Sequence, residues 1–126
     1  MSASPAKVAT VDHVVSWGES VHDPARQENA AIRVAVGVAT VWDVLDAASL
    51  QPRLAPTAQG EGPNLYVTGI GGVEQNRETG HHWAYLVDGD EPPVGPDAYV
   101  LRGGERIVWE YVHVSSGRKQ GTHPGF

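Results

Sequence analysis

The 126-residue chain contains no cysteine, which excludes disulfides, thiolate metal sites and a cysteine nucleophile but assigns no compartment. Positive charge is also scarce: nine Lys and Arg face fifteen Asp and Glu, giving a net charge of −6. No overall field therefore attracts nucleic acid or anionic lipid surfaces. Long apolar runs are missing too, since the weakly polar run 32–41 is interrupted by Arg33 and is far too short to span a membrane. We expect neither a nucleic-acid-binding protein nor an integral membrane protein.

Glycine and proline are abundant, with 15 and 9 copies, and predict many turns and more strand than helix. The length suits one domain, expected over 1–113, and the polar, Gly-rich residues 114–126 are expected to form a flexible tail. Period-two alternation predicts two antiparallel partner strands early in the chain and further strands after the middle. The predicted strands cover 8–17, 32–38, 65–70, 82–88, 106–113 and, more weakly, 98–101.

One helix is predicted at about residues 40–50. Thr40 followed by Asp43 resembles a capping box, and Val41, Val44, Leu45 and Ala48 form one apolar stripe. Two strands, one helix and a run of strands indicate an α+β domain, with the helix packed on a mixed or antiparallel sheet. A β-grasp-like arrangement fits this order.

Six histidines raise the question of a metal site. His81 and His82 are adjacent, and neighbouring side chains of a strand point to opposite faces, so one ion is not expected to take both. A metal-dependent enzyme would need three ligands converging from His13, His22, His81, His82, His113 and nearby acids. No G-x-S-x-G elbow surrounds any serine. We expect no catalytic residues and no bound metal.

Aromatic residues concentrate in the C-terminal strands, at Tyr66, Trp83, Tyr85, Tyr99, Trp109 and Tyr111. Period two places Trp83 and Tyr85 on one face of their strand and His82 on the other. If one helix covers only one face of the sheet, some of these rings must lie at the edge or on the open face. A flat apolar ligand could stack on them there.

The stretches "TVWDVLDAA", "GPNLYVTGIGG" and "HHWAYLVDGDEPPVGPDAYVLRGGERIVWEY" resemble, in order and spacing, the transcobalamin-like C-terminal domain family, also known as domain of unknown function 4430. The resemblance covers about residues 32–112. It implies a β-grasp-like fold in an extracytoplasmic protein, secreted or at the cell surface. In the animal cobalamin carriers of this family the domain forms one half of a clamp over cobalamin. By that resemblance, residues 62–70 and the strand around Trp83, Tyr85 and Leu86 would face the corrin, with His82 beside them.

The resulting hypothesis is a non-enzymatic ligand-binding domain for cobalamin or a related corrinoid, with no other cofactor. Its expected ligand-binding residues are Asn64, Tyr66, Thr68, His82, Trp83 and Tyr85. The alternative is an extracytoplasmic adhesion or scaffold module that binds a second protein through sheet edges, without a small ligand. The alternative predicts that Trp83 and Tyr85 are buried in the core, whereas ligand stacking requires them to be accessible.

Overall fold

The computed structural model of the protein describes residues 7–18, 27–48 and 54–121. Seven strands, one α-helix and two short 3-10 helices lie within these ranges. In chain order they are β1 (Val8–Ser16), β2 (Gln27–Ala35), α1 (Val41–Ala48), β3 (Thr57–Gln59), η1 (Gly62–Asn64), β4 (Tyr66–Ile70), β5 (Val73–Glu74), β6 (His81–Val87), β7 (Arg106–His113) and η2 (Val114–Ser116). None of the helices in these ranges has the length and apolar character to cross a membrane.

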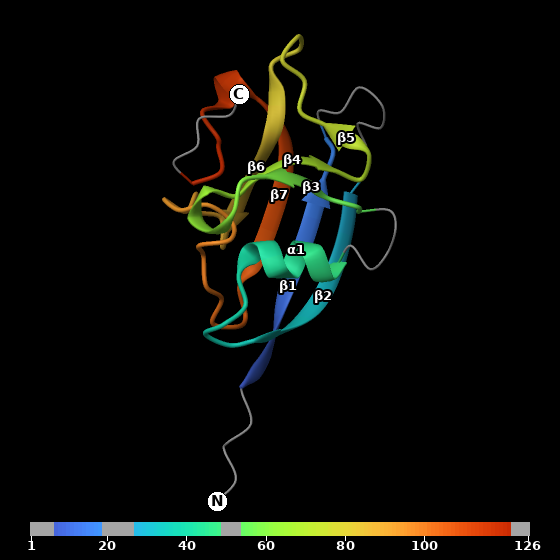
Figure 1. The fold of residues 1–126 in the computed structure, drawn as a ribbon. Helices are drawn as coiled ribbons and strands as arrows, with labels where there is room; N and C mark the ends of the chain where they lie inside the picture. Colours follow the sequence, from blue (N-terminus) through green and yellow to red (C-terminus); the bar gives the residue numbers. More distant parts are fainter. Residues whose placement is uncertain (1–6, 19–26, 49–53, 122–126) are drawn as a thin grey trace, which may run out of the picture.

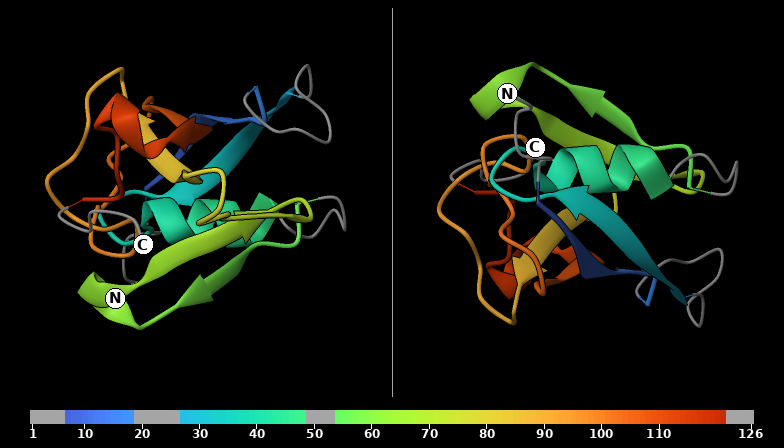
Figure 2. Two further views of the ribbon diagram at one scale, coloured as in Figure 1. Left: turned by 90° about the horizontal axis from the view of Figure 1, so that it is seen from above. Right: turned by 90° about the horizontal axis from the view of Figure 1, so that it is seen from below.

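The strands form two sheets that lie in separate layers. The larger sheet has the order β2-β1-β7-β6, in which β1 and β7 pair in parallel and the other neighbours are antiparallel. The smaller, antiparallel sheet has the order β3-β4-β5. Helix α1 and the smaller sheet both lie over one face of the larger sheet (Figures 1 and 2). This arrangement confirms the α+β class, while the finer β-grasp assignment stays a prediction.

The core fills the space between the two layers and is rich in large rings. Trp17, Trp83, Tyr85 and Trp109 have no exposed surface. Two of these rings connect the layers: the Trp17 indole N–H donates to the Ile70 carbonyl at 2.9 Å and that of Trp83 to the Val73 carbonyl at 2.8 Å. Because a buried indole N–H needs an acceptor, these bonds fix the small sheet on the large one.

Helix α1 begins as the sequence predicts. The Thr40 backbone N–H donates to Asp43 Oδ2 at 2.9 Å, and the Asp43 N–H donates to Thr40 Oγ1 at 3.2 Å, which is a reciprocal capping box. Val41, Val44 and Leu45 are buried, so the apolar stripe faces the core. The helix is described as far as Ala48, and the expected residues 49 and 50 lie outside the described ranges.

The small sheet was not expected, although its central strand was. Residues 57–59 and 73–74 lie outside every predicted strand, yet both pair with β4. The strand expected at 98–101 is wrong: Val100 makes an isolated bridge with Thr40, and Leu101 N–H donates to the Ala39 carbonyl at 2.8 Å. Its backbone is thus satisfied by the segment before α1 instead of a sheet.

The structure gives residues 114–121, the first part of the expected flexible tail, defined positions on the domain. Val114–Ser116 form η2, and Gln120 is 1% exposed. The Gln120 side chain makes three hydrogen bonds to main-chain groups of β4 and β6, which gives this segment a fixed place on the domain. Residues 122–126 lie outside the described part of the chain.

Candidate functional site

The six predicted ligand-binding residues lie on two neighbouring parts of the molecule. Asn64 ends η1 and is exposed, and Tyr66 and Thr68 follow on β4, where both are buried. His82, Trp83 and Tyr85 lie on β6 and are at most 1% exposed. Asn64 alone of the six presents a freely accessible side chain. Whether these residues bind a ligand stays a prediction.

The sequence leaves open whether the rings of Trp83 and Tyr85 are accessible or buried, and the structure buries both. Both are 0% exposed, because the small sheet together with α1 covers the face on which they lie. Accessible rings would require that one helix is the sole cover of the sheet. A ring without exposed surface cannot stack on a ligand. Trp83 and Tyr85 can therefore contribute to binding only indirectly, by supporting the residues that cover them.

Tyr85 anchors the loop that follows β6. Its hydroxyl donates to the Val94 carbonyl, and burial together with Tyr99 raises the pKa of the Tyr85 phenol. Burial likewise raises the pKa of Tyr66 to about 12. Both phenols therefore stay protonated near neutral pH, so the Tyr85 O–H remains available to hold the Val94 carbonyl.

Three segments that are distant in sequence meet beside this anchor: η1, the loop around Val94 and Gly95, and the chain near Gly121. A Cβ on Gly95 would lie 3.1 Å from the Pro63 carbonyl oxygen, and one on Gly121 would overlap the Val94 carbonyl group. The backbones are thus in close contact. Pro63, Asn64 and Val94 are exposed here, and we call these three residues the Asn64 surface.

Gln120 lies between β4 and β6, next to the Asn64 surface, and sequence reasoning missed it. Its side-chain oxygen accepts from Val67 N–H at 2.8 Å, while its NH₂ group donates to the carbonyls of Val67 at 2.7 Å and Trp83 at 3.0 Å. One carboxamide therefore bridges the two sheets. A single glutamine in a Gly-rich stretch carries no pattern from which this role could have been found.

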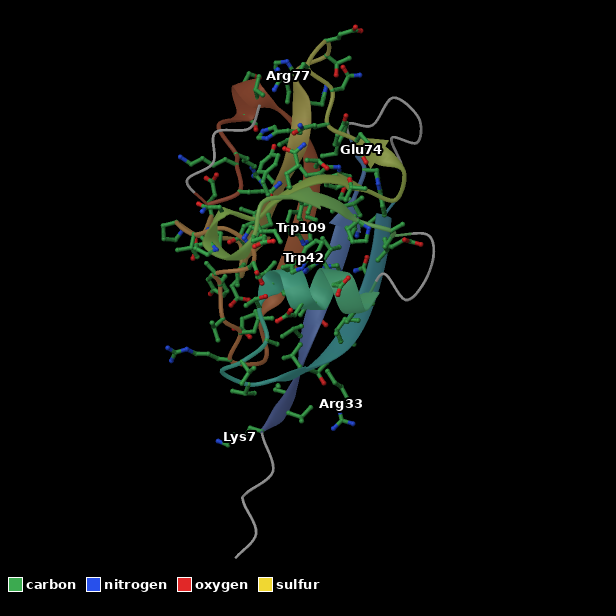
Figure 3. The ribbon with its side chains drawn as sticks, in the orientation of Figure 1. Lys7, Arg33, Trp42, Glu74, Arg77 and Trp109 are labelled. Atoms are coloured by element: carbon green, nitrogen blue, oxygen red, sulfur yellow. The ribbon has the colours of Figure 1, made fainter. Side chains whose placement is uncertain are left out.

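Thr68 belongs to a separate polar cluster at the other end of β4. Its Oγ1 is 2.9 Å from Thr57 Oγ1, which donates to Glu74 Oε1 at 2.7 Å. The Glu74 carboxylate lies over Gly69, where a Cβ would approach its oxygens to 2.5 Å. Glu74 is labelled on β5 in Figure 3, away from η1. The structure therefore does not gather all six predicted residues at one place.

The histidine pair lies on opposite faces of β6, as predicted. His81 stacks on Tyr111 with ring centroids 5.5 Å apart and is paired in register with His113, whereas His82 is buried and paired with Val112. Over residues 7–18, 27–48 and 54–121, no three side chains of His, Asp or Glu come together in a way that could hold a metal ion. His22, one of the histidines considered as a ligand, lies outside these ranges.

These features define a two-layer α+β domain whose exposed surface at η1 is braced by buried tyrosines and a buried glutamine. The chain belongs to the family described as domain of unknown function (DUF4430), whose sequence model matches residues 39–113. This confirms the family expected from the sequence motifs. No curated protein matches the sequence.

Two solved structures share the fold. The crystal structure of haptocorrin in complex with Cbi superposes with a TM-score of 0.73 at 18% identity, covering 89% of this chain and 27% of haptocorrin. The chain thus spans little more than a quarter of that protein. A proposed metal-binding protein from Ruminococcus gnavus ATCC 29149 superposes with a TM-score of 0.61 at 10% identity, covering 83% of this chain and 97% of that one. Such low identities establish a common fold and leave function to be argued from the site.

Proposed function

We propose that this chain is a non-enzymatic, extracytoplasmic ligand-binding domain, that its ligand is a corrinoid such as cobalamin, and that the Asn64 surface makes the contact. The observation that carries the proposal is the convergence of η1, the Val94 loop and the Gly121 segment on one exposed surface. The family and the fold shared with haptocorrin, whose structure holds Cbi, support this choice of ligand.

The Asn64 surface offers the two kinds of contact that a corrin edge needs. Val94 is 37% exposed, one of few large hydrophobic side chains at the surface of the described ranges, and Pro63 lies exposed in the adjoining segment. These side chains offer apolar area to the ring, and the Asn64 carboxamide can donate to and accept from a peripheral amide. Few groups have to be ordered on binding, because the Tyr85 hydroxyl and Gly95 hold the loop in place.

The remaining predicted residues are buried, and we propose that they support the Asn64 surface from inside the domain. Tyr85 fixes the Val94 carbonyl, Trp83 ties β6 to the small sheet, and Tyr66 begins the strand that continues from η1. Thr68 and His82 are proposed to hold the flanking parts of β4 and β6, where both are buried. Substituting any of these five would change stability as well as affinity, so exposed residues give the cleaner test.

Titration of the full chain with cyanocobalamin and aquocobalamin, followed by calorimetry and absorbance, tests the proposal. Val94→Asp and Asn64→Ala should each weaken binding without altering the thermal midpoint. Val38→Asp is the matched control, because Val38 is 70% exposed, lies in the turn after β2 and is not one of the three residues of the Asn64 surface. Absence of heat and of any spectral change at high micromolar corrinoid would show that the proposed ligand is wrong.

A second candidate, protein binding through a sheet edge, is favoured by β2. This strand ends the larger sheet, and Val34 is its one fully buried side chain. Alternate residues of an antiparallel strand bond to the neighbouring strand. Val36 N–H donates to the Lys7 carbonyl, so the even-numbered residues of β2 are the ones that bond to β1. The N–H and C=O groups of Ala31 and Arg33 therefore point away from the sheet. Figure 3 shows the Arg33 side chain directed outward. The burial of Trp83 and Tyr85 also agrees with this candidate.

An added strand from a partner would use these outward backbone groups. Ala31→Pro removes one of them while sparing the bonds between β1 and β2, and Ala31→Val is the matched control. Loss of partner capture by the proline variant alone would support edge pairing. Equal capture by both variants would exclude it.

A further inference from the structure

The three hydrogen bonds of Gln120 define a slot with a particular chemical complement. The slot presents one donor, the Val67 N–H, and two acceptors, the carbonyls of Val67 and Trp83. A primary carboxamide supplies one oxygen acceptor and two N–H donors, so it satisfies all three groups at once. Gln120 is 1% exposed, which places these bonds in a dry environment.

Other polar groups fit this slot poorly. A carboxylate would direct oxygen lone pairs at two carbonyl oxygens, and an ammonium group would direct its protons at the Val67 N–H. In a buried slot each mismatch leaves polar groups unpaired, which is strongly unfavourable. The slot therefore discriminates in favour of a primary carboxamide.

The segment that carries Gln120 is attached elsewhere mainly by exposed groups. Arg118 is paired with Glu110 at the surface, and Lys119 N–H donates to the exposed Glu91 carboxylate at 2.8 Å. Exposed pairs of this kind contribute little to stability. Gly121 contacts the Val94 backbone, which connects the slot directly to the Asn64 surface.

We propose that the slot between Val67 and Trp83 is a carboxamide-binding subsite, that Gln120 fills it in the free protein, and that a carboxamide of the ligand replaces Gln120 on binding. This inference rests on the proposed function, because corrinoids carry primary carboxamides around the ring edge. It adds a regulatory element, because the protein's own glutamine competes with the ligand for the slot. Only molecules with an empty slot can bind the ligand carboxamide, so the apparent affinity is the intrinsic affinity multiplied by the fraction of empty slots.

The test uses full-length chains and two probes. Cyanocobalamin carries peripheral carboxamides, and cobyrinic acid carries carboxylates in their place. Gln120→Glu should leave the slot and bind cyanocobalamin about a hundredfold more tightly than the wild type, as expected if its three buried hydrogen bonds keep Gln120 in the slot about 99% of the time. Lys119→Ala, an exposed neighbour outside the slot, should bind like the wild type. Cobyrinic acid should bind both chains equally. Equal affinities of wild type and Gln120→Glu for cyanocobalamin would overturn the inference.

Nitrogen-15 NMR of the wild type tests the same inference without the Gln120→Glu variant, so the result does not depend on whether that variant folds. Bound cyanocobalamin should move the Gln120 side-chain amide signals toward those of free glutamine, and unmoved signals on a saturated protein would contradict the inference. If cyanocobalamin binds neither chain, the proposed ligand fails, and the peptide acetyl-GRKQG-N-methylamide, whose Gln side chain is its one primary carboxamide, then decides the slot. Binding of this peptide to Gln120→Glu, with no binding of its Gln-to-Glu version, would support the slot, and equal behaviour of the two peptides would refute it.

Discussion

His13 makes the stability of this domain depend on pH in a way that can be worked out from its surroundings. Its side chain lies on the core-facing side of β1, paired in register with Ile107 and 1% exposed. Its Nε2 atom has no hydrogen-bond partner in the part of the chain that is described. Burial lowers the pKa of His13 from 6.5 to about 4, because the interior disfavours the imidazolium.

The sign and size follow from this difference. Between pH 6.5 and 4 the unfolded chain binds a proton at His13 and the folded chain does not, so acid favours unfolding. The free energy of unfolding is therefore unaffected above this window, decreases as the pH falls through it, and levels off below pH 4 as far as His13 is concerned. At about 1.4 kcal/mol per pKa unit, the full loss is about 3 kcal/mol.

Urea unfolding followed by tryptophan fluorescence can measure this loss at a series of pH values from 7 to below 4. The matched variant is His13→Leu, which keeps an apolar side chain of similar size and removes the titrating group. Subtracting the two curves cancels the other titrating residues that both chains share. The wild type should lose about 3 kcal/mol relative to the variant across the window. A difference that stays constant from pH 7 to pH 4 would refute the argument.

Three further predictions concern single contacts, each measured as a change in the free energy of unfolding. Thr40→Ala should cost about 1 kcal/mol, because it removes the cap that bonds Asp43 N–H; no change would show that the cap is dispensable. Gly69→Ala should cost about 1 kcal/mol through contact with the Glu74 carboxylate, and the cost should vanish when Glu74→Ala is present as well. Gln120→Ala should cost about 3 kcal/mol for its three buried hydrogen bonds, and a loss near zero would mean that water replaces them freely.

The parts of the fold that the sequence predicted are those whose signal is local. The reciprocal cap of Thr40 and Asp43 and the alternation along β1, β6 and β7 depend on residues a few positions apart. The turn after β6 also has a local cause: Asp88 and Gly89 both have positive φ, and Val87 N–H donates to the Asp90 carbonyl. Such signals survive in one sequence without any knowledge of the tertiary structure.

The parts that escaped prediction depend on distant partners. Residues 57–59 and 73–74 are too short to show alternation and exist as strands because β4 lies between them. Because the sequence does not predict this second sheet, it leaves open whether the rings of Trp83 and Tyr85 are exposed or buried. The docking of Gln120 depends on groups 37 and 53 residues away in sequence, which no local pattern encodes.

The parallel pair at the centre of the larger sheet joins the first and the last of the described strands. Residues of β1 and β7 that face each other, such as His13 and Ile107, are about 90 positions apart in sequence. During synthesis, β1 must therefore wait beside β2 until β7 has left the ribosome. Until then its β7-facing edge, including the Asp12 N–H that finally donates to the Glu105 carbonyl, is unpaired and open to other strands. We therefore expect the insertion of β7 between β1 and β6 to be the slow, aggregation-sensitive step in the folding of this domain.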